Sequence, residues 1–474
     1  MAAPGSEYVT PGALFELVAR GNKDKFFFSD DLKTAESPFN NIYESSEPHL
    51  GEVRTTVSNN DVSFGKMVEF VLETFGDVLT DMSVLVRMPT WLPSLPVTTG
   101  GTTYMPAEAN NMYHIVSAGT GTSYGWMRGI AYLLFEKIQI FQDNVLLQEV
   151  SGDSLLALDQ TTSTNVQYYM RAAEAGMHNG SARSVAAMAT PGTLRLRIPF
   201  PGLQGKYDGG LPLCCLREQT FKVRLWLRDA ESLWESSPTR NATTVAPWNT
   251  TFNVPGIVTG VGGAGRSSLG NPDLLLETRQ VYLTEDQISE LRSTHLKIPF
   301  VQYYDETYTI GEKDYEGLDR GGVAIVQRRL EGRHPMERLL LNFRSAEWLA
   351  HGQLWKIGGS EFYNSVGFLI AGKDREYAWP SAVLHGIQGL VKDERFMASR
   401  GQSEFRWSIN EGLGPNRMPT GTVNFSTASR PTLTVDLKNV TPFCDQRLTY
   451  LQVIGESWAQ YEVRDGRGRL VFID

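Results

Sequence analysis

Apolar and polar residues alternate in short runs along most of the chain. Between Val78 and Met88 an apolar side chain recurs at nearly every second position, and in 194–198 and 221–227 apolar residues alternate with Arg or Lys. This period places apolar side chains on one face of a strand and polar side chains on the other. Similar runs lie near residues 64–72, 132–141, 275–283, 295–309, 322–330, 337–343, 404–409, 432–437, 448–454 and 469–473. The pattern predicts many strands, several with one face in water.

Helical signals are few. Thr10-Pro11 precedes the periodic run 13–20, and Gly21 follows it, which is the order expected of a short helix. Thr284 and Gln287 form a capping box for a second helix that extends to Arg292. Because helices do not alternate with strands, the pattern favours an antiparallel sandwich or barrel over a parallel sheet. The second helix has strand-rich sequence on both sides, so it is the natural connector between two all-β domains.

Two long segments interrupt the strand pattern. Residues 90–124 are rich in Pro, Gly, Thr and Asn, and residues 229–272 are rich in Ser, Thr, Asn and Gly. Segments of this length inside a compact domain are usually functional surface loops. We therefore expect both to be exposed loops at the ends of the strands.

Composition and charge exclude several classes of protein. The chain has 474 residues, 44 basic and 53 acidic side chains and a formal charge of −9, which excludes a broadly basic nucleic-acid coat. Cys214, Cys215 and Cys444 are too few for a disulfide framework, so a reducing compartment is expected. The N-terminal residues lack the basic and apolar regions of a signal peptide, and no run approaches the roughly 20 apolar residues of a membrane span. These features predict a soluble protein made inside the cell.

The possible cofactor and metal motifs lack the flanking structure or the residue spacing that such sites require. Residues 260–265 match G-x-G-x-x-G, but 266–272 cannot continue as the helix that a dinucleotide site requires, so a flexible loop is the better interpretation. The histidines are scattered without the spacing of a zinc site; they are His49, His114, His178, His295, His334, His351 and His385. Cys214-Cys215 is interpreted as a pair of buried, inert thiols. We predict no catalytic, cofactor-binding or metal-binding residue.

A set of acidic residues and a run of basic residues leave a catalytic or binding function open. A glycosidase needs only two carboxylates that the fold brings together, and the candidates are Glu69, Glu73, Asp77, Asp81, Asp305, Glu306, Asp314 and Glu316. Solvated turns explain each of them more simply. The basic run 464–469 could contact a phosphate or an acidic partner, but its glycines and the apolar residues after it favour a hairpin turn.

Several runs, taken in chain order, resemble a single family. Residues 11–24 are similar to an opening "GGLxQLVAYGxQD", residues 59–79 to "FGxxVxFxIPRxGDLL", and residues 128–140 to "xxIGHALIxxIxLxIGG". The sharpest match is Met418–Ser426, Met-Pro-Thr-Gly-Thr-Val-Asn-Phe-Ser, against "PSGSINFS". Further matches lie at 197–201, 211–213, 221–225, 281–285, 334–339, 431–435 and 448–454. The family is the double jelly-roll major capsid proteins of nucleocytoplasmic large DNA viruses.

Two departures mark the chain as a divergent relative. Phe75-Gly76-Asp77 lacks the arginine of the family motif, and Ile140-Phe141-Gln142 replaces its Ile-Gly-Gly. The resemblance implies an all-β fold of two consecutive eight-stranded antiparallel jelly rolls with short helices and long surface loops. It divides the chain into an N-terminal arm with a short helix (1–22), a first roll (23–283) with long loops near 90–124 and 229–272, a connecting helix (284–294), and a second roll with a C-terminal tail (295–474).

By the same resemblance, the protein is not an enzyme and needs no cofactor. It implies that three chains form a pseudo-hexagonal capsomer, which tiles the icosahedral shell of a large double-stranded DNA virus. Its partners are the other copies of the homotrimer, neighbouring capsomers, minor capsid proteins and, indirectly, an internal viral membrane, without direct nucleic-acid contact. The resemblance places the protein in the virion, after synthesis and assembly in the host cytoplasm.

The alternative is a carbohydrate-binding or carbohydrate-active β-sandwich, because jelly rolls also occur in such proteins. Five tryptophans near the long segments could stack on sugars: Trp91, Trp126, Trp226, Trp234 and Trp248. Aromatic residues of this kind are more commonly part of a core or an interface. Trimers of hexagonal outline would support the capsid hypothesis, and monomers with glycan affinity would support the alternative.

Overall fold

The structure is a computed structural model. It describes residues 49–90, 97–99, 102–104, 123–162, 173–203, 210–217, 219–240, 244, 246–249, 269–384, 403–407, 421–441 and 447–472. The predicted helix at 10–21, the motif at 260–265 and Cys444 lie outside these residues. Among the described residues, no helix is both long and apolar enough to cross a membrane. Leu50–Asp474 forms one compact unit.

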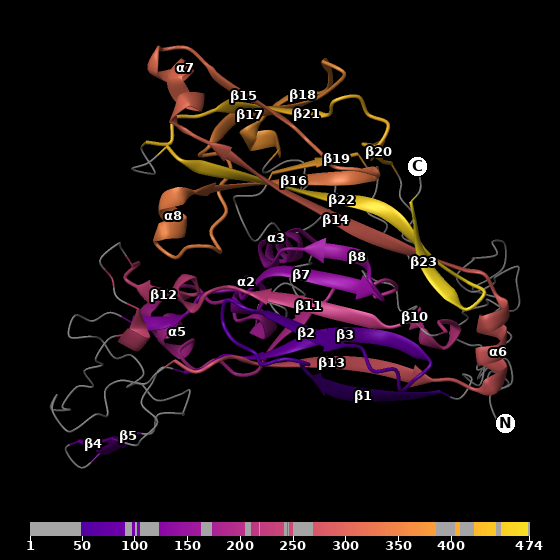
Figure 1. Cartoon of the computed structure of the whole chain (residues 1–474). Coiled ribbons are helices and arrows are strands. Elements are labelled where there is room, and N and C mark those ends of the chain that lie inside the picture. The colour runs from indigo at the N-terminus through magenta and orange to yellow at the C-terminus, as the bar shows by residue number, and fades with distance from the viewer. Residues whose placement is uncertain are drawn as a thin grey trace, which may run out of the picture. The chain divides into compact units, whose positions relative to one another are not determined.

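The first half of this unit folds into two antiparallel sheets (Figure 1). One sheet has the order β1 (Leu50–Val57), β13 (Asp273–Tyr282), β3 (Val78–Arg87) and β10 (Leu211–Pro212), and β9 (Leu194–Arg197) also pairs with β3. The other has the order β2 (Met67–Val71), β11 (Phe221–Leu227), β7 (Phe135–Gln142) and β8 (Val145–Val150). We call this half the first roll.

The second half repeats the arrangement. One sheet has the order β14 (Leu296–Ile310), β22 (Thr449–Arg464), β16 (Pro335–Ser345) and β19 (Ser403–Arg406), extended by β20 (Val423–Asn424) and β23 (Arg467–Phe472). The other has the order β15 (Ala324–Arg329), β21 (Thr432–Leu437), β17 (Tyr363–Ile370) and β18 (Lys373–Pro380). We call this half the second roll.

Both halves connect their strands in the same way. When the main strands of each half are counted in chain order, with β9 and β10 sharing one position, one sheet joins positions 1-8-3-6 and the other joins 2-7-4-5. This crossing of strands between two packed sheets is the topology of a jelly roll. Among the described residues, the sheets hold five and four strands in the first roll and six and four in the second, so the predicted count of eight per roll is not confirmed.

The alternating pattern accounts for the cores. In β11, Val223 and Leu225 are fully buried while Lys222 and Arg224 lie on the other face. In β3, Met82, Val84 and Val86 are buried as predicted. The alternation breaks at Thr80, where the register with β13 shifts by one residue and Leu79 becomes buried in place of its neighbour. A bulge of this kind moves side chains to the opposite face, which a period-two pattern does not reveal.

The predicted connector is present as α6 (Glu285–Ser293), which lies between the two rolls in sequence. Its capping box is confirmed, with the backbone N–H of Thr284 donating to Gln287 Oε1 at 3.1 Å. Other helices are α2 (Ile130–Leu133), α3 (Gly152–Thr162), α5 (Ala182–Ala187), α7 (Glu316–Asp319) and α8 (Ala346–Ala350). The pattern does not predict α3, because its polar residues are buried together with its apolar ones and it has no exposed polar face.

The two predicted loops are partly wrong. Their ends form strands, β6 (Ser123–Trp126) and β12 (Trp234–Ser237), which pair with each other. Trp126 and Trp234 are buried there and anchor the segments to the first core. Within the rest of the first segment, β4 (Val97–Thr99) pairs with β5 (Thr102–Tyr104). The polar composition of these segments hid the aromatic residues at their described ends, and residues 105–122 and 250–268 lie outside the described residues.

Candidate functional site

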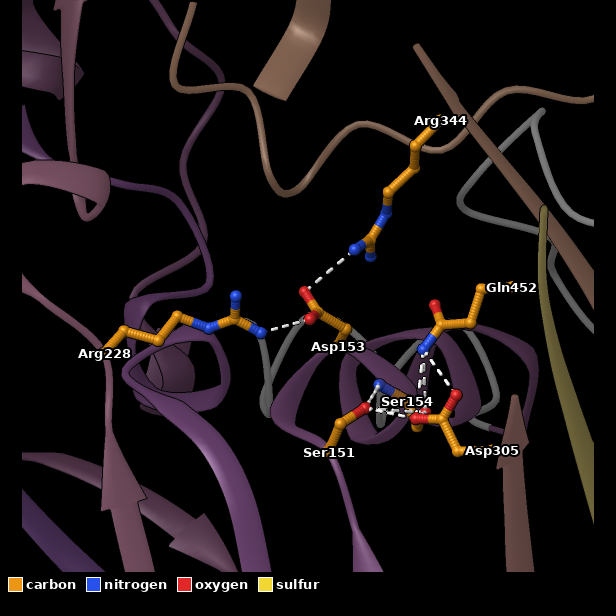
Figure 2. A network of polar contacts seen from close by, with 7 residues as sticks. All are labelled: Ser151, Asp153, Ser154, Arg228, Asp305, Arg344 and Gln452. Carbon is orange, nitrogen blue, oxygen red and sulfur yellow. Dashed lines mark hydrogen bonds and ion pairs between the residues drawn. The ribbon is translucent and has the colours of Figure 1, made fainter. Parts of the chain in front are cut away.

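The two rolls meet through a network of polar side chains at the start of α3 (Figure 2). Asp305 of β14 accepts hydrogen bonds from Ser151 Oγ at 2.6 Å and from Ser154 Oγ at 2.5 Å. Gln452 Nε2 of β22 donates to Asp305 Oδ1 at 3.0 Å and to Ser154 Oγ at 3.1 Å. Two strands of the second roll therefore bind the first turn of a helix of the first roll. We call the contact between the rolls the roll interface.

An ionic contact lies beside this network. Asp153 is buried between Arg228 of the first roll and Arg344 of the second, whose Nη1 lies 3.0 Å from Asp153 Oδ1 (Figure 2). Burial raises the pKa of Asp153, but the charges of Arg344 and Arg228 outweigh burial and hold it below its usual value. The carboxylate thus stays ionised and links a cation from each roll.

An apolar contact continues the roll interface along α3. Ala157 and Leu158 pack with Leu340 of β16 and Ile454 of β22 in one buried cluster. Gln302 Nε2 of β14 donates to the carbonyl oxygen of Leu147 in β8 at 2.8 Å. Figure 1 shows α3 and β8 next to β14. The outer face of the second roll's 1-8-3-6 sheet is therefore covered by the first roll.

The C-terminal hairpin makes a second contact between the rolls. Gly468 of β23 binds Gln219 of the first roll through its N–H at 2.7 Å, and its carbonyl oxygen accepts from Gln142 Nε2 at 3.0 Å. Tyr461 Oη donates to Gln142 Oε1 at 3.0 Å. The turn itself is Asp465-Gly466, with φ values of 53° and 80°. The basic run 464–469 is thus the hairpin turn that its glycines predict.

A buried group of charges lies on β16, β19 and β22 of the second roll. Arg338 is fully buried and donates to Glu456 through Nε at 2.6 Å and Nη2 at 2.7 Å. Its Nη1 lies 3.6 Å from Glu404. Burial alone lowers the pKa of Arg338, but Glu456 and Glu404 raise it overall. The bidentate ion pair with Glu456 keeps the arginine charged and joins the adjacent strands β16 and β22.

The fold matches known structures over nearly its whole length. One match is a structure of PBCV-1 VP54, fitted into a reconstruction of the virophage Sputnik, with a TM-score of 0.67 and 14% sequence identity. The alignment covers 92% of this chain and 100% of the VP54 chain. A second match is the Faustovirus major capsid protein, with a TM-score of 0.59 and 12% sequence identity. The alignment covers 99% of this chain and 100% of the Faustovirus chain. No protein-family model and no curated protein matches the sequence. The chain has the double jelly-roll fold of these capsid proteins.

Within this double jelly roll, all but one of the carboxylates considered for catalysis contact structural partners, and the exception is Glu73, which is exposed. Glu69 pairs with Arg224 at 2.7 Å, Asp81 with Arg195 at 2.7 Å, Asp314 with Arg328 at 3.2 Å and Glu316 with Arg320 at 3.2 Å. Asp77 accepts the backbone N–H of Leu283 at 2.9 Å, and Glu306 that of Glu331 at 3.4 Å. Asp305 lies in the roll interface. A solvated turn is therefore the wrong explanation for the four that lie on strands, which are Glu69, Asp81, Asp305 and Glu306.

Thiols and histidines are placed as structural groups. Cys214 and Cys215 carry free thiols with their sulfur atoms 3.8 Å apart, and burial raises the pKa of Cys214 to about 12. Cys215 is buried and Cys214 is half-buried, so the predicted burial is confirmed for one of the two thiols. Burial raises the pKa of both, which disfavours the reactive thiolate. His178 and His295 each contact one glutamate, Glu235 at 2.9 Å and Glu462. Across the residues that the structure describes, no cluster of three or more His, Cys, Asp or Glu could hold a metal ion.

The tryptophans offer little to a sugar ligand. Trp126 and Trp234 are buried, and Trp248 packs against both, with ring centroids 6.1 and 6.5 Å away. Trp226 is 43% exposed on β11, and its Nε1 donates to Gln139 at 3.3 Å. Trp91 lies outside the described residues. The aromatic cluster therefore belongs to the core of the double jelly roll.

Proposed function

We propose that this chain is a structural major capsid protein of a large double-stranded DNA virus. The observation that carries the proposal is the double jelly-roll fold itself, which matches two viral capsid proteins over their complete lengths. The ordered series of sequence motifs points to the same family. We place the protein in the virion and its assembly in the host cytoplasm.

The capsid role requires three copies in a pseudo-hexagonal capsomer. Two rolls in each of three chains give six similar units, which approximate six-fold packing in an icosahedral shell. Neighbouring capsomers and minor capsid proteins are the further partners, with an internal viral membrane as an indirect one. We retain the division of the chain into an arm (1–22), a first roll (23–283), a connecting helix (284–294) and a second roll (295–474). The roll interface supports this role because it joins both rolls into one unit.

We propose no enzymatic activity, no metal requirement and no direct contact with DNA. Most of the carboxylates considered for catalysis are engaged in ion pairs or hydrogen bonds, and the formal charge of −9 offers little neutralisation of phosphates. A chelator should leave the melting curve unchanged. A gel shift of duplex DNA at physiological salt would contradict the absence of DNA binding.

Native mass measurement and negative-stain imaging test the capsid role. We expect trimers with a hexagonal outline and a melting temperature that rises with protein concentration, because subunit association stabilises the folded state by mass action. A monomer at micromolar concentration whose melting temperature ignores dilution would refute the proposal. If such a monomer bound glycans, the carbohydrate-binding alternative would replace it.

A further inference from the structure

The sequence contains a single Asn-Gly step, Asn179-Gly180, just before α5; Figure 1 shows α5 next to β12. An asparagine that precedes a glycine can lose its side-chain amide, because the backbone nitrogen of the glycine attacks Cγ of the asparagine and closes a succinimide ring. Glycine leaves this approach open, since it has no Cβ atom beside the nitrogen. Asn179 is exposed, so water reaches its amide. The structure places a base, a pair of hydrogen-bond donors and a cation around this step.

The base is a histidine held against the attacking nitrogen. The backbone N–H of Gly180 donates to Nδ1 of His178 at 3.2 Å, so Nδ1 carries no proton and can accept one. The other ring nitrogen, Nε2, lies 2.9 Å from Oε1 of Glu235 on β12, and both side chains are buried. A carboxylate behind an imidazole fixes the ring and stabilises the imidazolium that forms when the ring takes a proton. The contact with Glu235 thus leaves Nδ1 of His178 directed at the reacting N–H.

A pair of donors binds the oxygen on which negative charge develops. The backbone N–H of Ser181 donates to Oδ1 of Asn179 at 3.0 Å, and Oγ of Ser184 donates to it at 2.6 Å. Ser184 Oγ also lies 2.9 Å from the carbonyl oxygen of Ser181, which is the longer of its two contacts. Attack on Cγ moves an electron pair onto Oδ1, so donors that are already in place stabilise the tetrahedral intermediate.

The cation is Arg128, which lies against the same glycine. Gly180 has a φ of 76°, and a Cβ atom on it would lie 2.4 Å from Nη2 of Arg128. The guanidinium is held in place by Glu235, 3.4 Å from its Nε, and by the ring of Trp355, whose centroid is 3.5 Å from its Cζ. Its positive charge stabilises the negative charge that forms on the Gly180 nitrogen as the proton leaves.

We propose that Asn179 is a self-modification site at which His178 takes the proton of the Gly180 N–H and the freed nitrogen attacks Asn179 Cγ. The N–Cγ bond forms as the carbonyl electron pair moves to Oδ1. When this pair returns, the Cγ–Nδ2 bond breaks, and Nδ2 leaves as ammonia with the proton that His178 held. Water then opens the succinimide to aspartate or isoaspartate. Each chain reacts once, with water as the co-reactant, and the reaction does not depend on the proposed capsid role.

Peptide mass spectrometry of the folded, full-length chain tests this site. At neutral pH we expect Asn179 to deamidate roughly 100-fold faster in the wild type than in His178→Gln, which is the effect of a general base. The matched control is His295→Gln, because His295 also lies beside a glutamate, and it should react like the wild type. In urea, all three chains should deamidate at the same rate. A wild-type rate in His178→Gln that is folded by circular dichroism would overturn the inference.

The pH dependence of the wild type gives a second readout, which decides the matter if His178→Gln does not fold. Glu235 faces the His178 imidazole directly, and Arg128 faces it across the shared carboxylate. With His178 as the base, the rate in the folded protein should rise as the imidazole loses its proton and then level off. In urea the rate should keep rising with the hydroxide concentration. A folded chain that follows hydroxide over the whole range, or that reacts no faster than the chain in urea at neutral pH, would overturn the inference.

Discussion

Arg338 is the strongest single test of the buried charges on the outer face of the second roll's 1-8-3-6 sheet, where it lies opposite Glu456. Its side chain is fully buried, and its guanidinium group forms an ion pair with Glu456. Removing one partner of a buried pair leaves the other charge uncompensated, which costs about 3–5 kcal/mol. We expect Arg338→Ala to lower the free energy of unfolding by that amount in urea denaturation. The control Arg320→Ala breaks an exposed pair with Glu316 and should change it by less than ~0.5 kcal/mol. Similar losses in both variants would contradict the role of Arg338.

Asp153 gives the roll interface a predictable response to acid. Its pKa is lowered in the folded protein, so the ionised form stabilises the fold above the ordinary aspartate pKa of about 3.9. This contribution is lost as the pH falls through the folded pKa. We expect Asp153→Asn to lower the melting temperature at pH 7, and the gap to the wild type to narrow below about pH 4. A gap that stays constant down to pH 2 would show that the charge of Asp153 is not what stabilises the interface.

At the scale of elements, the two faces of β11 predict opposite responses to one substitution. Val223 is fully buried, whereas its neighbour Lys222 lies half-buried on the other face. Val223→Asp places an unpaired charge in the first core, so we expect loss of soluble protein on expression. Lys222→Asp should remain soluble and folded by circular dichroism. Soluble expression of the Val223 variant would contradict the assignment of the core face.

For the whole molecule, the C-terminal hairpin predicts that the rolls unfold together. A Cβ atom at Gly468 would lie 2.0 Å from Tyr461 Oη, so Gly468→Ala must displace a buried side chain that holds both rolls. We expect a loss of about 1–3 kcal/mol in stability. In hydrogen exchange, the loss should appear in β11 of the first roll as well as in β21 of the second. The control Gly192→Ala meets no atom within 4 Å and should exchange like the wild type. A loss confined to β22 and β23 would show that the rolls unfold separately.

Much of the architecture is predictable from local sequence, because a strand with one wet face shows a period of two and a helix start shows its cap. Val223, Leu225 and the capping box at Thr284 illustrate this. The resemblance to the capsid family further predicted that the strands form two consecutive jelly rolls. The candidate site was much less predictable: Asp305 was one of several acidic residues, and nothing local distinguishes the one that binds Ser151, Ser154 and Gln452.

The sequence by itself therefore determined the strand-rich halves, the connector between them and the hairpin at Asp465-Gly466, since these depend on residues close together in the chain. Only the tertiary structure decided the register bulge at Thr80, the helix α3 and the contacts of the roll interface. Asp153 and Arg344 are far apart in sequence, and so are Gln142 and Gly468. Their meeting depends on how two complete rolls pack, and side-chain periodicity within a single segment carries no information about that packing.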